Sequence, residues 1–348
     1  MPSLTSAFLT EIHFGNADMA SIHRLGEYLG KQTLFRQQMP EVLDTLIEQA
    51  RVESTESSNR LEGIKAPHLQ IEKMVLKLVK PRNRSEQEIA GYRDVLGMLH
   101  ERAEHIPMTP NVILQLHQKL YGYLPGEGGH WKMTDNEIVE RDARGNVTRI
   151  RFKPVPAVVT PPAMDALCSA LKERSGAGAP DALVLIPLFV LDFLCIHPFR
   201  DGNGRMARLL TLLLLYQSGY EVGRYISLER VIEEAKEGYY ETLEISSQNW
   251  HESRHDPMPW LRYFWGTLLK AYKEFEERVG VVTRSVGGKS HRVREAVLRQ
   301  IAPFSISEIE RVCPGTSRET IRNVLREMRD GKIIEPTGKG RGAKWFKK

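Results

Sequence analysis

The fold is decided by the stretch His197-Pro198-Phe199-Arg200-Asp201-Gly202-Asn203-Gly204-Arg205-Met206-Ala207-Arg208. It separates two apolar runs, Ala182–Ile196 and Leu209–Tyr216, which indicate buried helices. Pro198 and the Gly-Asn-Gly triplet cannot continue a helix, so they predict a loop, with the second helix beginning at about Asn203 or Gly204. Unpaired backbone amides at the start of that helix predict an anion site, and phosphate is its usual occupant.

The side chains of this stretch suit phosphate chemistry. Asp201 supplies one carboxylate, and Mg²⁺ is commonly held by few protein ligands together with phosphate and water. Arg205 and Arg208 lie three residues apart on the predicted helix, so they share a face. His197 can accept a proton near neutrality, because its unperturbed pKa is about 6.5. Each residue alone has an ordinary structural explanation, but together they predict a base, a metal carboxylate and a phosphate site.

This stretch resembles the signature of the Fic family, His-Pro-Phe-x-Asp/Glu-Gly-Asn-Gly-Arg-x-x-Arg, at every fixed position. The resemblance implies a protein adenylyltransferase that moves AMP from ATP to a hydroxyl side chain of a target protein, and of itself. It implies that His197 is the general base, that Asp201 holds Mg²⁺ and that Phe199 anchors the loop. The α- and β-phosphates would be held by Gly202, Asn203, Gly204 and Arg205, and the γ-phosphate by Arg208.

A second motif lies at the end of a helix predicted over about residues 40–63. From the residues alone, Ser58-Asn59-Arg60-Leu61-Glu62-Gly63 is a polar helix end closed by glycine. Beside the signature, it resembles the inhibitory motif of the Fic family, Ser/Thr-x-x-x-Glu-Gly/Asn. The resemblance implies that Glu62, with Ser58, inhibits the enzyme by pairing with Arg208.

Two short strands, Glu137–Val139 and Thr148–Phe152, predict a hairpin around an Asp/Gly/Asn turn. An ordinary surface hairpin is one interpretation. In the Fic family such a hairpin, the flap, binds the target by strand addition, so the resemblance implies a target protein docked on residues 137–152. It also implies nucleotide contacts from Ile150, Arg151 and Tyr239.

Gly129-His130-Trp131-Lys132 resembles a further family segment, Gly-x-Tyr/Trp-Arg, with Lys in place of the final Arg. Among the three scattered cysteines, Cys195 offers a thiol nucleophile two residues before His197. It ends an apolar run, which favours the role of a small buried hydrophobe.

Composition places the chain among ordinary globular proteins, with 348 residues, 41% hydrophobic and 27% charged. The odd number of cysteines indicates a reducing compartment, and the first residues resemble no secretory leader, so we expect a cytoplasmic protein without a membrane partner. The net charge of +5 is unevenly distributed. Residues 284–348 carry 16 Lys and Arg against 7 Asp and Glu, which indicates a separate basic module.

That module predicts a winged helix-turn-helix, with three helices followed by two short strands around a basic loop. On the third helix, apolar side chains line one side and arginines another. The residues expected to contact duplex DNA are Arg318, Arg322, Arg326 and Arg341. Protein contact or dimerisation through the same module is the alternative, and a homodimer is compatible with the sequence.

The expected fold is therefore all-α, a Fic-type helical bundle with a short β-hairpin flap, plus the winged helix-turn-helix. The expected regions are an N-terminal helical region (1–105), a catalytic core (106–280), a linker (281–290) and the winged domain (291–348). ATP and Mg²⁺ are the implied substrate and ion. The alternatives are a nucleotide-sensing, DNA-binding transcriptional regulator, or an enzyme that transfers another phosphate-containing group.

Overall fold

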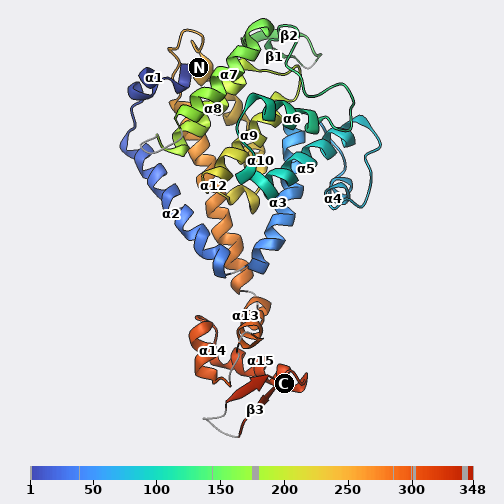
Figure 1. Ribbon diagram of the computed structural model, residues 1–348, viewed down its shortest axis with the longest axis vertical. Helices are drawn as coiled ribbons and strands as arrows, with labels where there is room; N and C mark the ends of the chain where they lie inside the picture. Colours follow the sequence, from blue (N-terminus) through green and yellow to red (C-terminus); the bar gives the residue numbers. More distant parts are fainter. Residues whose placement is uncertain are drawn as a thin grey trace. The chain divides into compact units, whose positions relative to one another are not determined.

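The computed structural model describes residues 2–38, 40–142, 144–174, 180–284, 286–298, 300, 303–338 and 344–347. The chain forms two compact units, Met1–Phe275 and Glu276–Lys348. The described part of the first unit is helical apart from one hairpin (Figure 1). Within these ranges no helix combines the length and the apolar character needed to cross a bilayer.

The elements of the first unit follow one another as a series of helices interrupted once by strands. In chain order they are η1 (Pro2–Leu4), α1 (Ser6–Glu11), α2 (Asn16–Gln38), α3 (Pro40–Leu61), α4 (His68–Val75), α5 (Arg84–Arg102), η2 (Ala103–His105), α6 (Pro110–Leu120), β1 (Ile138–Arg141), β2 (Val147–Phe152), η3 (Ala157–Val159), α7 (Thr160–Glu173), α8 (Ala182–Ile196), α9 (Asn203–Gln217), η4 (Val222–Arg224), α10 (Leu228–Glu234), α11 (Lys236–Ser247) and α12 (Met258–Arg284), which continues past the boundary between the units.

Helices α8 and α9 pack against each other in the middle of the first unit (Figure 1). Apolar side chains occupy every face of α8, as expected of a helix buried all round. Helix α8 begins where the Asp181 side chain accepts a hydrogen bond from the backbone N–H of Leu183. The apolar runs on both sides of the signature therefore form the core helices that their composition predicts.

A tryptophan of α12 supplies the hydrogen bond that the proline inside α8 cannot make. Pro187 has no N–H to donate to the carbonyl of Leu183, four residues earlier. The indole N–H of Trp265 donates to that carbonyl at 2.8 Å, and Trp260 donates to the carbonyl of Pro187 at 2.8 Å. Both indoles are buried, so these bonds fix the position of α12 on α8.

The hairpin β1–β2 is antiparallel, with Ile138 opposite Phe152 and Val139 opposite Ile150. The Asp142 carboxylate closes the turn by accepting the backbone N–H groups of Arg144 and Asn146. The expected strands are confirmed within two residues at their ends.

The hairpin is attached to α11 by two arginines of β2. Arg149 lies 2.7 Å from the carboxylate of Glu244, and Arg151 makes a second ion pair with the same carboxylate. Arg151 also donates to the carbonyl of Tyr240 at 3.3 Å. Glu244 is therefore the shared anchor of the hairpin.

The second unit contains α13 (Val286–Leu298), α14 (Ile306–Val312), α15 (Arg318–Asp330), β3 (Ile334–Pro336) and β4 (Trp345–Lys347). Its strands pair antiparallel, and its core is formed by one face of each helix together with Phe304, Cys313 and Ile334. The stretch expected to link the two modules, residues 281–290, contains the last residues of α12, which extends to Arg284, and the first residues of α13, which begins at Val286; residue 285 lies outside the described residues. Glycine costs a helix about 1 kcal/mol per residue, so the Gly287-Gly288 pair weakens α13 without excluding it.

We expect Trp265→Phe to lower the free energy of unfolding by about 1–3 kcal/mol, because the buried Leu183 carbonyl loses its partner. In a Pro187→Ala background the new backbone N–H serves that carbonyl, so the same substitution should cost less. Urea unfolding of the four proteins measures the difference. An equal loss in both backgrounds would contradict this account.

We expect Glu244→Ala to speed hydrogen exchange of the β2 amides several-fold, because two arginines lose the carboxylate that ties the hairpin to α11. Glu241→Ala, an exposed position on the same helix, is the matched control. Exchange of β2 that is equally slow in both variants would show that other contacts hold the hairpin.

Candidate active site

One pocket collects residues that are far apart in the sequence. They come from the turn after α3, from β2, from the C-terminal end of α8, from the first turns of α9 and from α11. The predicted site residues that line it are Glu62, Arg151, His197, Gly204, Arg208 and Tyr239.

His197 ends α8 in the left-handed conformation, with φ 50° and ψ 60°. Its Nδ1 lies 3.3 Å from the carbonyl oxygen of Leu194, so Nδ1 carries the proton and Nε2 holds the lone pair. Burial lowers the pKa of His197 to about 4, although the Leu194 carbonyl opposes that change. The ring is therefore neutral at pH 7, as a proton acceptor must be.

The loop after His197 is closed by the side chain of Asn203. Its Oδ1 accepts the backbone N–H of Phe199 at 2.9 Å, and its Nδ2 donates to the Phe199 carbonyl at 2.8 Å. Asn203 is buried, so its side chain shapes the loop rather than facing the pocket. The side chain of Phe199 is fully buried and anchors the loop in the core.

The first turn of α9 faces the pocket with little side-chain cover. Gly202 has φ 82°, a left-handed value that glycine adopts without strain, and forms the N-cap of α9. A Cβ on Gly204 would lie 2.2 Å from Oε1 of Glu62, so that carboxylate rests directly on the backbone at the start of the helix. An anion at this position is favoured by the helix dipole and the free amides.

Arg208 holds the Glu62 carboxylate from the other side. Its Nη2 lies 2.7 Å from Oε1 of Glu62, its Nε donates to Oγ of Ser58 at 2.9 Å, and Nη2 also donates to the Ser58 carbonyl at 2.9 Å. Burial disfavours the charge of Arg208, yet the Glu62 carboxylate keeps the pKa of the guanidinium above its ordinary value. Glu62, Ser58 and Arg208, expected as a group from the sequence, thus lie in direct contact.

Arg205 points elsewhere. Its guanidinium is buried, lies 2.8 Å from the carboxylate of Glu88 on α5 and donates to the hydroxyl of Tyr121 at 2.8 Å. It is 3.9 Å from the carboxylate of Asp201. The structure therefore places Arg205 beneath the loop and pairs it with acids of the protein, whereas Arg208 faces the pocket.

Asp201 lies in a neighbouring polar pocket with Tyr121, Arg84, His130 and Arg200. Its side chain is 67% exposed, and its Oδ1 accepts the N–H of Gly202 at 2.6 Å. Across the described ranges, no cluster of three or more His, Cys, Asp or Glu side chains could hold a metal by itself. One exposed carboxylate fits an ion whose other ligands are phosphate and water.

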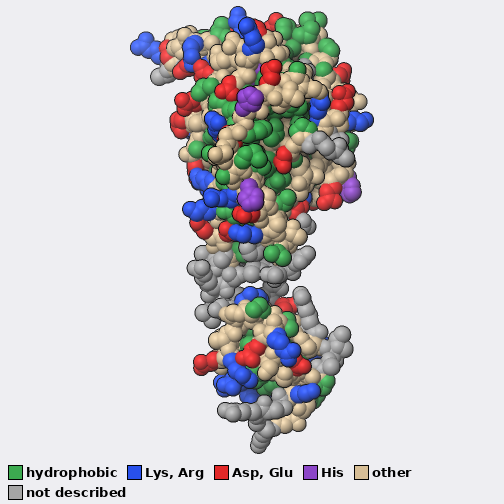
Figure 2. All heavy atoms as spheres, turned by 90° about the vertical axis from the view of Figure 1, so that its left-hand side faces the viewer, with side chains coloured by type: hydrophobic (Ala, Val, Ile, Leu, Met, Phe, Trp, Pro, Cys, Tyr) green, Lys and Arg blue, Asp and Glu red, His purple; other side chains and the backbone are tan. Residues whose placement is uncertain are grey.

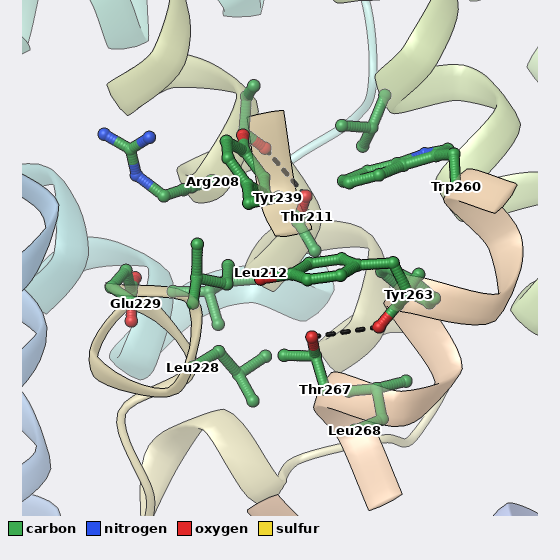
Figure 3. Close-up of a pocket in the computed structure, with 14 residues that line it drawn as sticks. Arg208, Thr211, Leu212, Leu228, Glu229, Tyr239, Trp260, Tyr263, Thr267 and Leu268 are labelled. Carbon is green, nitrogen blue, oxygen red and sulfur yellow. Dashed lines mark hydrogen bonds between the residues drawn. The ribbon is translucent and has the colours of Figure 1, made fainter. Parts of the chain in front are cut away.

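The two tyrosines of α11 differ in exposure. Tyr239 is buried, and Figure 3 shows it between Arg208 and Trp260, beside a second, mainly apolar pocket that the Arg208 guanidinium points away from. Tyr240 is 36% exposed, and its hydroxyl donates to the Leu61 carbonyl at 3.3 Å. Both line the pocket of His197, but Tyr240 offers the more accessible ring.

The remaining predicted residues divide between this pocket and the surface. Arg151 lines the pocket, whereas Ile150 lies on an adjoining surface hollow. Cys195 lines the pocket as a buried thiol, and burial raises its pKa, which disfavours the reactive thiolate. On α15, Arg318, Arg322 and Arg326 are exposed, while Arg341 lies outside the described residues.

Residues outside the signature hold the loop, and sequence reasoning did not assign them. His117 of α6 stacks on Phe199 with ring centroids 3.6 Å apart, accepts the N–H of Gly129 at Nδ1 and lies 3.1 Å from the Asp201 carbonyl through Nε2. Lys132 contacts the carbonyl of Ile196 at 3.0 Å. The resemblance of residues 129–132 to a family segment was the signal that could have pointed to them.

Residues 107–215 match the family model described as Fic/DOC family. A crystal structure of a Fic family protein from Desulfovibrio desulfuricans is similar over 97% of both chains, with a TM-score of 0.63 and 20% identity. A Fic domain-containing signalling protein from Bacteroides thetaiotaomicron gives 0.60 and 21%, over 75% of this chain and 98% of that one. Fic-1 from C. elegans (residues 134–508) gives 0.56 and 19%, over 77% of this chain and 74% of that one. At these identities the likeness shows a shared fold, and the family match within it shows that the chain carries a Fic/DOC family domain over residues 107–215.

Proposed function

We propose that this protein is an adenylyltransferase that moves AMP from ATP to a hydroxyl side chain of a target protein and of itself. Proteins with Fic domains generally transfer AMP or other groups onto proteins. The observation that carries the proposal is the position of His197, whose Nε2 is left free to accept a proton beside the first turn of α9.

The proposed step is an attack on the α-phosphorus. The target oxygen forms a bond to that phosphorus while the bond to the bridging oxygen breaks, and pyrophosphate leaves with the electron pair. The hydroxyl proton passes to Nε2 of His197, a transfer that contributes roughly 10²–10⁴-fold to the rate. The backbone of Gly202 and Gly204 and the guanidinium of Arg208 would stabilise charge on the phosphates, in a pocket partly shielded from water.

Asp201 would hold the Mg²⁺ that accompanies the triphosphate and neutralises part of its charge. Tyr240 or Tyr239 would receive the adenine ring, and the edges of the β1–β2 hairpin would accept an extended segment of the target. Arg149 and Arg151 support this last role because their ion pairs with Glu244 keep the hairpin beside the pocket.

We further propose that Glu62 inhibits the enzyme. Its carboxylate rests on the backbone of Gly204 and pairs with Arg208, so it occupies the position and the cation that a terminal phosphate requires. ATP would still enter, but its phosphates would settle in an unreactive arrangement. The position of the turn after α3 is reinforced by Arg60, which forms an ion pair with Glu233 of α10.

A second function is supported by the basic face of α15. Arg322 and Arg326 are exposed and contact no acidic side chain among the described residues, whereas Arg318 lies 3.6 Å from Glu310. Figure 2 shows several Lys and Arg side chains on the visible face of the second unit, with Asp and Glu side chains among them. We propose that α15 binds duplex DNA as the recognition helix of a winged helix-turn-helix.

His197→Ala should abolish transfer of label from α-labelled ATP while leaving ATP binding largely unchanged, since the base acts only as the hydroxyl attacks. Labelling of a cell lysate and calorimetric ATP binding measure the two properties. γ-labelled ATP and labelled UTP distinguish transfer of phosphate or UMP. Undiminished labelling by the variant would defeat the mechanism.

Glu62→Gly should raise labelling well above that of the parent, because the incoming γ-phosphate replaces the carboxylate as the partner of Arg208. Removing one member of a buried pair ordinarily costs about 3–5 kcal/mol, so increased activity would be a distinctive result. Arg208→Ala should lower labelling in the Glu62→Gly background. Lys65→Gly is the control for added backbone freedom, and equal activity of all these proteins would refute the inhibitory role.

DNA affinity should fall steeply as salt rises, because phosphate contacts release counterions. Arg322→Ala with Arg326→Ala should weaken binding at fixed salt, and Arg318→Ala should weaken it less. Fluorescence anisotropy with a labelled duplex measures all three proteins. A DNA affinity that changes neither with salt nor with these substitutions would favour protein contact as the role of this unit.

A further inference from the structure

The backbone on both sides of His197 is held by a segment that does not belong to the signature. We call residues 132–136 the clamp segment. The backbone N–H of Lys132 donates to the carbonyl of Pro198 at 2.8 Å, and its Nζ donates to the carbonyl of Ile196 at 3.0 Å. The carbonyls directly before and after His197 are therefore both held by one lysine.

The clamp segment reaches one residue further along the loop. Nζ of Lys132 also donates to Oδ1 of Asn136 at 2.9 Å, and Nδ2 of Asn136 donates to the carbonyl of Phe199 at 3.3 Å. Because the Asn136 amide receives one bond and gives the other, the lysine and the asparagine act as a connected pair.

This arrangement compensates for two local costs. The carbonyl of Ile196 belongs to the last turn of α8, where intrahelical donors are missing and a cation is favoured. A non-glycine residue in the left-handed conformation costs roughly 1–2 kcal/mol, so His197 needs fixed neighbours to remain in it. The Lys132 side chain is only 4% exposed, so its bonds face little competition from water.

The charge of Lys132 also acts on His197. Burial is the main cause of the lowered pKa of His197, and the ammonium of Lys132 lowers it further, while the carboxylates of Glu62 and Asp201 oppose this. Burial lowers the pKa of Lys132 itself to about 8, against the opposing carboxylate of Asp135, so the lysine is mostly charged at pH 7.

We propose that Lys132 is a positioning residue for the catalytic base: it fixes His197 through the carbonyls on either side and places a positive charge beside the imidazole. The part of this proposal that concerns catalysis rests on the proposed transfer function. The fixed geometry holds Nε2 beside the first turn of α9, and the positive charge adds to burial in favouring the unprotonated ring.

The test compares Lys132→Met, which preserves length and the backbone bond to Pro198 but removes the charge and the side-chain donors, with Lys132→Arg, which retains both. In Lys132→Met we expect the pKa of His197, followed by NMR with His197→Ala for assignment, to shift upward. We expect kcat for transfer to fall roughly 10- to 100-fold at nearly unchanged KM for ATP, as for a misplaced catalytic group. Lys132→Arg should restore both, and Lys172→Met, an exposed position on α7, should change neither.

Asn136→Ala tests the same proposal independently, and it replaces Lys132→Met if that variant does not fold. It removes no charge, so the pKa of His197 should stay unchanged while kcat falls. The proposal is overturned if His197 titrates as in the parent in folded Lys132→Met protein, or if Asn136→Ala retains full kcat. Glu62→Gly protein, freed of the proposed inhibition, that transfers no AMP would refute the proposed function, but the NMR titration would still test the position and charge of Lys132.

Discussion

The pair of hydrogen bonds between the Asn203 side chain and the Phe199 backbone is the constraint on which the site depends. It closes the turn between two largely buried helices, α8 and α9. Because Asn203 satisfies both polar groups of Phe199, that residue can bury its ring without leaving an unpaired amide or carbonyl. The amides at the start of α9 then remain available on the opposite side of the turn, where a ligand anion can reach them.

Burying two arginines on one helix requires two acidic partners, and this requirement brings other helices to the site. A charge held away from water is stable only when it is paired and hydrogen-bonded. Arg205 pairs with Glu88 on α5. Arg208 pairs with Glu62, in the turn after α3, and donates a hydrogen bond to the backbone carbonyl of Ser58, in the last turns of α3. The Arg205–Glu88 pair lies beneath the loop and supports it, whereas the Arg208–Glu62 pair lies at the pocket. The same kind of ion pair therefore stabilises the loop in one case and carries the proposed inhibition in the other.

The surroundings of His197 illustrate how burial and charge work together. Burial lowers the pKa of His197 and so favours the neutral ring, and the ammonium of Lys132 lowers the pKa further. The Leu194 carbonyl fixes the proton on Nδ1, which orients the free lone pair. These effects come from the end of α8 and from Lys132, outside the signature loop, so the properties of the base belong to the fold as much as to the motif.

The sequence by itself determined the helical class, the α8–loop–α9 core and the flap hairpin, because apolar runs, proline and glycine act locally on the backbone. Through the resemblance it also indicated that Glu62 and Arg208 belong together. Only the tertiary structure decided that the side chains of Asn203 and Arg205 turn inward, and that Lys132 holds the loop. Those outcomes depend on which acids, carbonyls and rings lie opposite one another in space, and no local sequence pattern fixes that.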